Sequence, residues 1–304
     1  MIRRIFLFVL TNIAIIVMGT IILGLIERLF GIDIRGSLHT NYFSLALFAL
    51  FYWFFWAFIS LLTSRWMAKK FHHMRLLSPD DIGAWTATEK LVYQTVDRIA
   101  QSNGIKIPEV GIYESPEVNA FATGATKNSS LVAVSSGLLN QMKNDEIEGV
   151  VAHEMAHILN GDMVTMTLLQ GIINAFVIFL SRAIAQIVSM AGRRDEEGSN
   201  GLVYFVVTIV LEILLGLLGS LIVMSYSRRR EFAADSGSAT FVGKDKMINA
   251  LKALQKIHET NSVIPSDPKI AALKIDGKTT GFMHLFASHP PLEERIQHLN
   301  NLYI

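Results

Sequence analysis

The chain has 304 residues, of which 51% are hydrophobic and only 17% are charged, and its mean hydropathy is +0.39. This composition is too apolar for an ordinary soluble domain and indicates a membrane protein. The formal net charge of +1 gives no broad electrostatic attraction to nucleic acid or acidic partners, so no nucleic-acid partner is expected. Without cysteine, only His, Asp and Glu side chains remain as candidate zinc ligands.

Four long apolar runs are the predicted membrane-spanning helices, at residues 5–26, 41–63, about 166–188 and about 201–224. Each is long enough to cross the hydrocarbon core of a lipid bilayer as a helix. The first run exceeds the apolar region of a signal peptide and is not followed by a small-residue cleavage site, so we expect a retained anchor. For the last two runs, an amphipathic or partly immersed hairpin is the alternative.

Basic residues beside these runs predict the orientation in the membrane. They precede the first run, follow the second and follow the fourth, at Arg3, Arg4, Arg65, Lys69, Lys70, Arg75, Arg228, Arg229 and Arg230. Since Lys and Arg in such flanks stay on the cytoplasmic side, the N-terminus and the regions after the second and fourth runs are predicted to be cytoplasmic. The expected parts are membrane hairpins at 1–75 and 166–224 and cytoplasmic catalytic parts at 76–165 and 225–304.

The first catalytic part has the composition of a soluble domain. Apolar residues recur at helical spacing over 86–101, and a second helix, capped by Asn144 or Asp145, is predicted to run to about Asn160. Between the two helices lie three short β-like pieces, at 110–113, 120–123 and 131–135. A small sheet with helices is therefore expected.

The middle β-like piece is a candidate for substrate binding. An exposed sheet edge can bind an extended peptide through main-chain hydrogen bonds. The residues that we assign to this edge are Asn119, Ala120, Phe121 and Ala122. The alternative is a strand with a purely structural role.

The pentapeptide His153-Glu154-Met155-Ala156-His157 carries the clearest chemical signal. On a helix, residues four apart share one face, so the imidazoles of His153 and His157 can converge on one ion, with Glu154 beside it. This is the HExxH pattern of zinc metalloproteases. A catalytic zinc site uses three protein ligands and leaves the fourth position to water, so a third ligand must come from elsewhere.

Glu231 is the best candidate for that third ligand, because it lies in a segment of helical composition beyond the last apolar run. Asp235, four residues on, falls on the same face as Glu231. It can hold a ligand histidine by accepting the second ring N–H, as carboxylates around metal sites do. The alternative for the whole pattern is a helix with two surface histidines and a structural ion pair.

Three further polar residues stand out. His289 precedes Pro290 and Pro291, which fix the local backbone, so it can be presented to the site as an electrophilic or proton-donating group; a capping or surface histidine is the alternative.

Glu212 lies in the middle of the fourth apolar run, where an acid costs a few kcal/mol. We expect it to face the protein interior or a solvated groove, with structural pairing as the alternative. Arg182 can snorkel to a membrane interface.

The chain contains, in this order, two N-terminal apolar runs, NAFATG, HEMAH followed by NGD, two more apolar runs, SRRREFAAD and SHPPLEERI. This order of features resembles the HtpX family of membrane zinc metalloproteases, which are relatives of the CAAX prenyl protease type. The resemblance covers nearly the whole chain. It implies a mainly α multi-pass membrane protein with a zincin-type α+β catalytic domain, a small β-sheet and an HExxH active-site helix. It also implies one Zn²⁺ bound by His153, His157 and Glu231, with Glu154 catalytic.

The resemblance further implies the role of the protein. It would be a metalloendopeptidase of the bacterial inner membrane that cleaves misfolded or damaged membrane proteins in quality control and the stress response. In zinc-assisted hydrolysis Glu154 accepts a proton from water and passes it to the leaving amine, while His289 is a candidate to stabilise the oxyanion. The rivals are a site-specific processing protease and a metal-stabilised membrane scaffold or sensor; finding three ligands rather than four favours catalysis. The sequence leaves the oligomeric state open.

Overall fold

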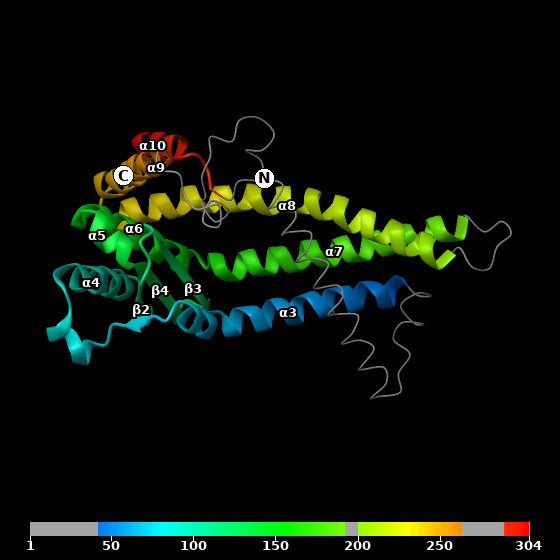
Figure 1. Cartoon of the computed structure of the whole chain (residues 1–304), viewed down its shortest axis with the longest axis horizontal. Helices are drawn as coiled ribbons and strands as arrows, with labels where there is room; N and C mark the ends of the chain where they lie inside the picture. The colour runs from blue at the N-terminus through cyan, green and yellow to red at the C-terminus, as the bar shows by residue number, and fades with distance from the viewer. Residues whose placement is uncertain (1–41, 192–199, 263–288, 304) are drawn as a thin grey trace. The chain divides into compact units, whose positions relative to one another are not determined.

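The computed structural model describes residues 42–191, 200–262 and 289–303 (Figure 1). The predicted first span, residues 5–26, lies outside these residues. The described chain forms two compact units. The helical unit comprises residues 42–55 and 170–221, and the mixed unit comprises residues 56–169, 222–262 and 289–303.

Three long helices contribute to both units: α3 (Tyr42–Phe71), α7 (Asp162–Ala191) and α8 (Asn200–Val242). By length and composition, the segments Phe48–Phe71, Asp162–Ser189 and Gly201–Val242 can cross a membrane. The first segment overlaps the second predicted run, 41–63, from residue 48 onwards, and the other two contain the third and fourth predicted runs. The helices α3 and α8 continue well past their apolar runs, because Lys and Arg in their flanks are themselves good helix formers. The predicted end of the fourth run at residue 224 therefore lies inside α8, which appears as one continuous ribbon in Figure 1.

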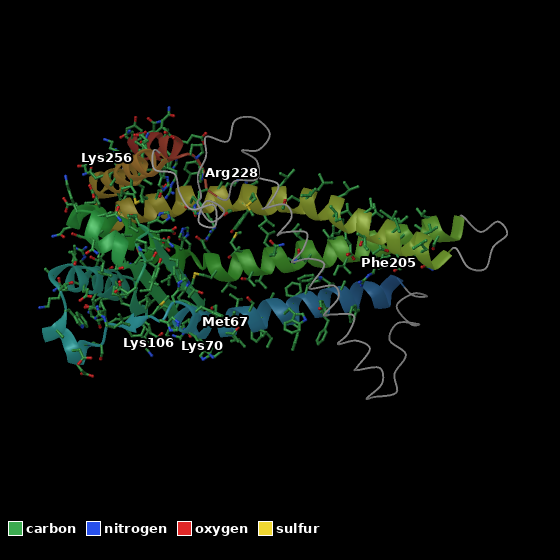
Figure 2. All side chains as sticks on the ribbon, viewed as in Figure 1. Met67, Lys70, Lys106, Phe205, Arg228 and Lys256 are labelled. Carbon is green, nitrogen blue, oxygen red and sulfur yellow. The ribbon has the colours of Figure 1, made fainter. Side chains whose placement is uncertain are left out.

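Small residues allow the helices of the helical unit to pack closely. Ala49 and Trp53 of α3 pack against Ala175 and Ile178 of α7. A Cβ added to Gly219 of α8 would lie 2.5 Å from a methyl group of the Ile173 side chain. Large apolar side chains project from the outer faces of the same helices, among them Phe205 near the start of α8 (Figure 2). Outward apolar side chains are what a lipid environment favours.

The mixed unit contains a four-stranded sheet in the order β1-β2-β4-β3. The strands are β1 (Arg75–Leu76), β2 (Glu109–Tyr113), β3 (Ala120–Thr126) and β4 (Ser129–Ser135). β2 and β4 are parallel, whereas β1 with β2 and β3 with β4 are antiparallel. The three predicted β-like pieces are thus β2, β3 and β4, and β3 lies at an edge of the described sheet. Two residues are too few to give β1 a sequence pattern.

The helices of the mixed unit are the 3₁₀ helix η1 (Pro79–Ala84), α4 (Ala87–Ser102), α5 (Ser136–Gln141), α6 (Asn144–Asn160), α9 (Lys244–Ser262) and α10 (Leu292–Asn300). The helix α6 packs against β3 and β4, α4 and α9 pack against α6, and α10 packs against α9. The predicted helix over 86–101 is α4, and Thr86 is its N-cap, with its side chain accepting the Glu89 N–H. The predicted cap of α6 is wrong by one residue: Lys143 occupies the N-cap, because Glu146 accepts its backbone N–H at 2.8 Å.

The core of the mixed unit holds α6 in place. Val92 and Val96 of α4, Val132 of β4, and Val151 and Met155 of α6 are all fully buried in one cluster. Of the 17 residues of α6, most are buried, including both of its histidines. The predicted active-site helix is therefore a rigid central element of this unit rather than a surface helix.

Candidate metal centre

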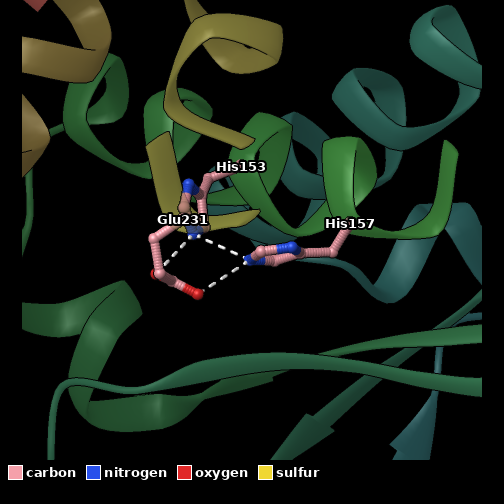
Figure 3. A group of neighbouring side chains, drawn as sticks. All are labelled: His153, His157 and Glu231. Atoms are coloured by element: carbon pink, nitrogen blue, oxygen red, sulfur yellow. Dashed lines mark hydrogen bonds and ion pairs between the residues drawn. The ribbon is translucent and has the colours of Figure 1, made fainter. Parts of the chain in front are cut away.

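α6 presents two histidine rings to one point. His153 and His157 stand one turn apart, and each is only 7% exposed. Their Nε2 atoms lie 3.1 Å from each other, with the ring planes nearly perpendicular (Figure 3). This is the convergence that the four-residue spacing predicts.

α8 brings Glu231 to the same point. Glu231 is 1% exposed, with Oε2 at 3.5 Å from His153 Nε2 and Oε1 at 3.4 Å from His157 Nε2 (Figure 3). The two helices approach closely because Gly237 has no side chain: a Cβ there would lie 2.8 Å from the Cβ of Ala156. Ser238 ties them together by donating a hydrogen bond to the Gly149 carbonyl at 2.9 Å.

Carboxylates face the other nitrogen of each ring. Asp235 Oδ1 lies 2.9 Å from His153 Nδ1, and Asp162 Oδ2 lies 2.5 Å from His157 Nδ1. An ionised carboxylate can only accept, so each Nδ1 carries a proton; once the proton on Nε2 is lost, each ring offers an Nε2 lone pair to the point where Glu231 lies. The structure thus places Asp235 where the sequence suggested.

Sequence reasoning missed Asp162. It reaches His157 because α6 ends at Gly161, whose left-handed conformation (φ +72°) turns the chain so that α7 begins at Asp162. The Asn-Gly-Asp sequence, which begins three residues after the second histidine, was the available signal.

Sequence reasoning also missed Arg295 of α10. This buried guanidinium donates to both oxygens of Asp235, with Nε at 2.8 Å and Nη2 at 2.6 Å, and its Nη1 lies 3.5 Å from Glu231 Oε2. A bidentate contact of this kind fixes the carboxylate in position and compensates its charge. The available signal was an arginine within the segment SHPPLEERI, which has no pattern to indicate the partner of that arginine.

His289 also approaches the site. Its Nδ1 lies 2.9 Å from Glu231 Oε2, and its side chain is about one-third exposed. The ring therefore stands at the solvent side of the buried carboxylate. Its role in the reaction stays a prediction.

Glu154 lies next to His153 and is partly exposed, so it borders the buried triad without joining it. The edge strand β3 packs against α6. Ala120 and Ala122 face the core of the mixed unit, whereas the Phe121 ring contacts Tyr113 and His72. Asn119 precedes the strand, with its N–H bonded to Ser135 Oγ at 3.0 Å.

The carboxylates govern protonation of the rings. Burial opposes protonation of His153, but hydrogen bonds to Asp235 and Glu231 outweigh it and raise the pKa of His153 to about 9. Burial likewise opposes protonation of His157, and its contacts with Asp162 and Glu231 raise its pKa. A metal ion that binds these rings must therefore displace a proton.

The residues fit a metal ion on geometry and chemistry. His153, His157 and Glu231 each offer a ligand atom within 4.8 Å of the others. In tetrahedral zinc coordination with bonds of 2.0–2.1 Å, two ligand atoms are about 3.3 Å apart. The observed separations are 3.1, 3.4 and 3.5 Å. Both Glu231 oxygens are buried beside the two Nε2 atoms, so three potential electron-pair donors converge on one point, which suits a cation.

The chain matches a known protein family and known relatives over most of its length. Residues 86–303 match the model of Peptidase family M48. The chain is 47% identical over 305 residues to "Protease HtpX" from Tolumonas auensis, covering 99% of both chains. It is 48% identical over 303 residues to "Protease HtpX homolog" from Nitrosomonas europaea, covering 99% of this chain and 100% of the relative.

A solved structure shares the fold. The crystal structure of S. mikatae Ste24p superposes with a TM-score of 0.63 at 18% sequence identity. The match covers 94% of this chain and 64% of Ste24p, so the chain spans under two thirds of that protein. At this identity the likeness concerns the fold alone.

Proposed function

The chain belongs to Peptidase family M48 and is a membrane metalloprotease of the HtpX type, and from this premise we propose its metal, its catalytic residues and its substrates. His153, His157 and Glu231 bind one zinc ion, and Glu154 is the catalytic base. The substrates are misfolded or damaged membrane proteins, cleaved as endopeptidase substrates on the cytoplasmic side of a bacterial inner membrane. The role is membrane protein quality control.

The observation that carries the proposal is the convergence of the two Nε2 atoms and the Glu231 carboxylate. Among the described residues this is the group of His, Asp and Glu side chains with metal-binding spacing, and it has three members. A structural zinc site is normally closed by four protein ligands, whereas a catalytic site keeps one position open. Three ligands therefore support a catalytic role.

The reaction divides between the metal and the side chains around it. When bound, zinc supplies Lewis acidity, which polarises the peptide carbonyl and makes water a better nucleophile at neutral pH. Glu154, adjacent to His153 and partly exposed, takes the proton from water and delivers it to the leaving amine. Asp235 and Asp162 keep both Nε2 lone pairs free, and the partly exposed His289 is the candidate donor to the developing oxyanion.

β3 is the proposed binding edge for the substrate. It pairs with β4 on one side only, so within the described sheet its other edge has main-chain groups available for an extended peptide. Ala120, Phe121 and Ala122 lie in this strand, and Asn119, whose main-chain N–H and carbonyl are bonded to Ser135, precedes it and can offer its side chain. Its packing against α6, which carries Glu154, supports the assignment.

The membrane location of the enzyme supports the substrate class. Three described helices are apolar and long enough to span a bilayer. Lys69 and Lys70 at the end of α3 and Arg228–Arg230 in α8 flank the apolar segments and favour a cytoplasmic catalytic region. An enzyme held at the membrane meets membrane proteins first, which is why we propose them as substrates.

The test uses Glu154→Gln in the full-length protein in detergent. The amide keeps the shape of the side chain but cannot act as a base, so casein-type cleavage is expected to fall by about 10²- to 10⁴-fold. Metal analysis of the same preparation should still find one zinc per chain, and a chelator should stop cleavage by the wild-type protein.

Asp145→Asn is the matched control, because it makes a carboxylate-to-amide change at an exposed position of the same helix. It should cleave like the wild-type protein. Full cleavage by Glu154→Gln would remove Glu154 from its role, and cleavage that resists exhaustive metal removal would reject the metal mechanism.

A further inference from the structure

The hydrogen bonds of β3 show which of its main-chain groups face the free edge of the described sheet. The Asn119 carbonyl accepts the Ser135 N–H at 2.9 Å, so the main chain of Asn119 points towards β4. In an antiparallel pair, successive residues direct their main-chain groups alternately towards the partner strand and away from it. The main chain of Phe121 therefore points towards β4 as well. Ala120 and Ala122 direct their N–H and C=O groups to the free edge.

The side chains of these residues alternate between the two faces of the sheet. Ala120 and Ala122 pack against the core cluster that contains residues of α6. Phe121 therefore points to the opposite face. Its ring centre lies 5.8 Å from that of Tyr113 and 5.4 Å from that of His72. The edge thus combines main-chain groups for hydrogen bonding with one aromatic ring beside them.

The ring of Phe121 is held in position and remains accessible. Tyr113, which is 5% exposed, packs against it, and the rings of Tyr113 and His72 are themselves 5.0 Å apart. His72 is exposed, and Phe121 is partly exposed. Contacts among the three rings fix the Phe121 ring while part of it stays at the surface. A side chain that arrives at the free edge therefore meets a ring that is already in place.

The occupant of this edge is an extended peptide. The chain belongs to a peptidase family, so its substrates are polypeptides. A peptide that pairs antiparallel with β3 bonds to the main chain of Ala120 and Ala122 and has one residue opposite Phe121. That position is a non-hydrogen-bonded pair, in which the two Cα atoms are about 4.5 Å apart and the side chains are closest. The substrate side chain there lies on the same face of the sheet as the Phe121 ring.

We propose that Phe121 is a specificity-determining residue that selects an aromatic side chain at this one position of the substrate. This inference rests on the proposed function, because it requires the substrate to lie along β3. Two aromatic rings paired across strands attract each other beyond the effect of the area that they bury, so Phe is favoured over Leu. The substrate residues on either side point to the other face and do not contact the ring. Because folded proteins mostly bury Phe, this preference favours unfolded substrates.

The experiment uses the full-length protein in detergent and a set of unstructured polypeptides. A parent polypeptide without aromatic residues is cleaved, and mass spectrometry locates the scissile bond. Matched substrates then carry Leu, Phe or Lys at each of the three positions on either side of that bond, and the cleavage point is confirmed for each. At one position the ratio of kcat/KM for Phe over Leu should be about two- to tenfold, the factor that corresponds to an aromatic pair.

Two variants and one control test the role of the ring. Phe121→Leu keeps an apolar side chain of similar size but removes the ring, so the ratio at that position should fall to about one, with the ratios at its neighbours unchanged. Phe121→Tyr retains the ring and should retain the preference. Phe241→Leu is the control, because it makes the same change at another partly buried position of the mixed unit, and it should keep the wild-type ratio.

Casein separates failure of this inference from failure of the proposed function. If the wild-type protein cleaves neither casein nor the polypeptides, the proposed function fails. If it cleaves casein but shows no Phe preference, or if Phe121→Leu keeps that preference, Phe121 does not determine specificity. A larger gain from Lys than from Phe at the same position would show that the ring attracts a cation, and would also overturn the inference. An equal loss of cleavage of all substrates in Phe121→Leu would assign the ring a structural role and reject the inference as well.

Discussion

Glu231 and Glu212 are two acidic residues of the same helix with opposite surroundings. Glu231 lies among two imidazoles, His289 and Arg295, and the rings are themselves oriented by further carboxylates. Glu212 has one compensating arginine and a serine whose hydroxyl proton is already donated elsewhere. The groups around Glu231 are held in place by further contacts, so they define one ligand geometry, as a metal ion requires.

The largest expected effect is a difference in zinc content between variants of Glu231 and variants of Glu212. Glu231→Ala removes one of three proposed ligands. Zinc affinity should therefore fall by more than the roughly 10- to 100-fold loss caused by removing a residue that orients a ligand without touching the metal. Glu212→Gln should retain one zinc per chain. Metal analysis after gel filtration measures both, and equal zinc content in the two variants would abolish the distinction.

The next effect concerns the arginine that organises the Glu231 shell. Arg295→Met leaves buried Asp235 without its bidentate partner, and breaking such a pair should lower the free energy of unfolding by about 3–5 kcal/mol. Arg98→Met is the control: Arg98 is largely exposed and contacts Glu148 at 3.0 Å, a carboxylate that Lys246 also binds. It should cost under about 1 kcal/mol. Urea titration measures both, and equal costs would show that Arg295 does not organise the site.

Much of the centre could be predicted from sequence because it depends on local spacing. The HExxH pattern fixes two rings on one helix face, and Glu231 and Asp235 follow the same rule on α8. The β-like pieces and the capped α4 likewise depend on short patterns.

The remaining contacts depend on tertiary structure. Arg295 meets Asp235 across 60 residues of sequence, and nothing in its own segment indicates that partner. Asp162 reaches His157 only because Gly161 adopts a left-handed conformation. α8 continues through its arginines because charge alone does not end a helix, so the boundary expected at 224 has no counterpart in the backbone.

A smaller effect is expected from the carboxylates that orient the rings. Asp235→Asn and Asp162→Asn keep the shape of each side chain but weaken the hold on His153 and His157. Each should lower zinc affinity by about 10- to 100-fold, measured by competition with a chelator. Asp145→Asn again serves as control. An unchanged affinity in both variants would show that the rings are oriented by packing alone.

Metal binding by the wild-type protein should also depend on pH. In the metal-free protein the pKa of His153 is raised to about 9, so the ring is protonated at neutral pH and zinc must displace that proton. Zinc affinity should therefore rise by up to about tenfold per pH unit below pH 9 and level off above it. Chelator competition from pH 6 to 10 measures this. An affinity independent of pH over that range would contradict the assignment of His153 as a ligand.

The central claim is that His153, His157 and Glu231 together bind the catalytic metal, and X-ray absorption spectroscopy of the zinc-loaded protein tests it most directly. The predicted spectrum shows two imidazole ligands and a carboxylate oxygen at about 2.0–2.2 Å. Glu231→Gln should alter the oxygen shell and keep the imidazole features. A spectrum with three or more imidazoles, or one unchanged by Glu231→Gln, would contradict the claim.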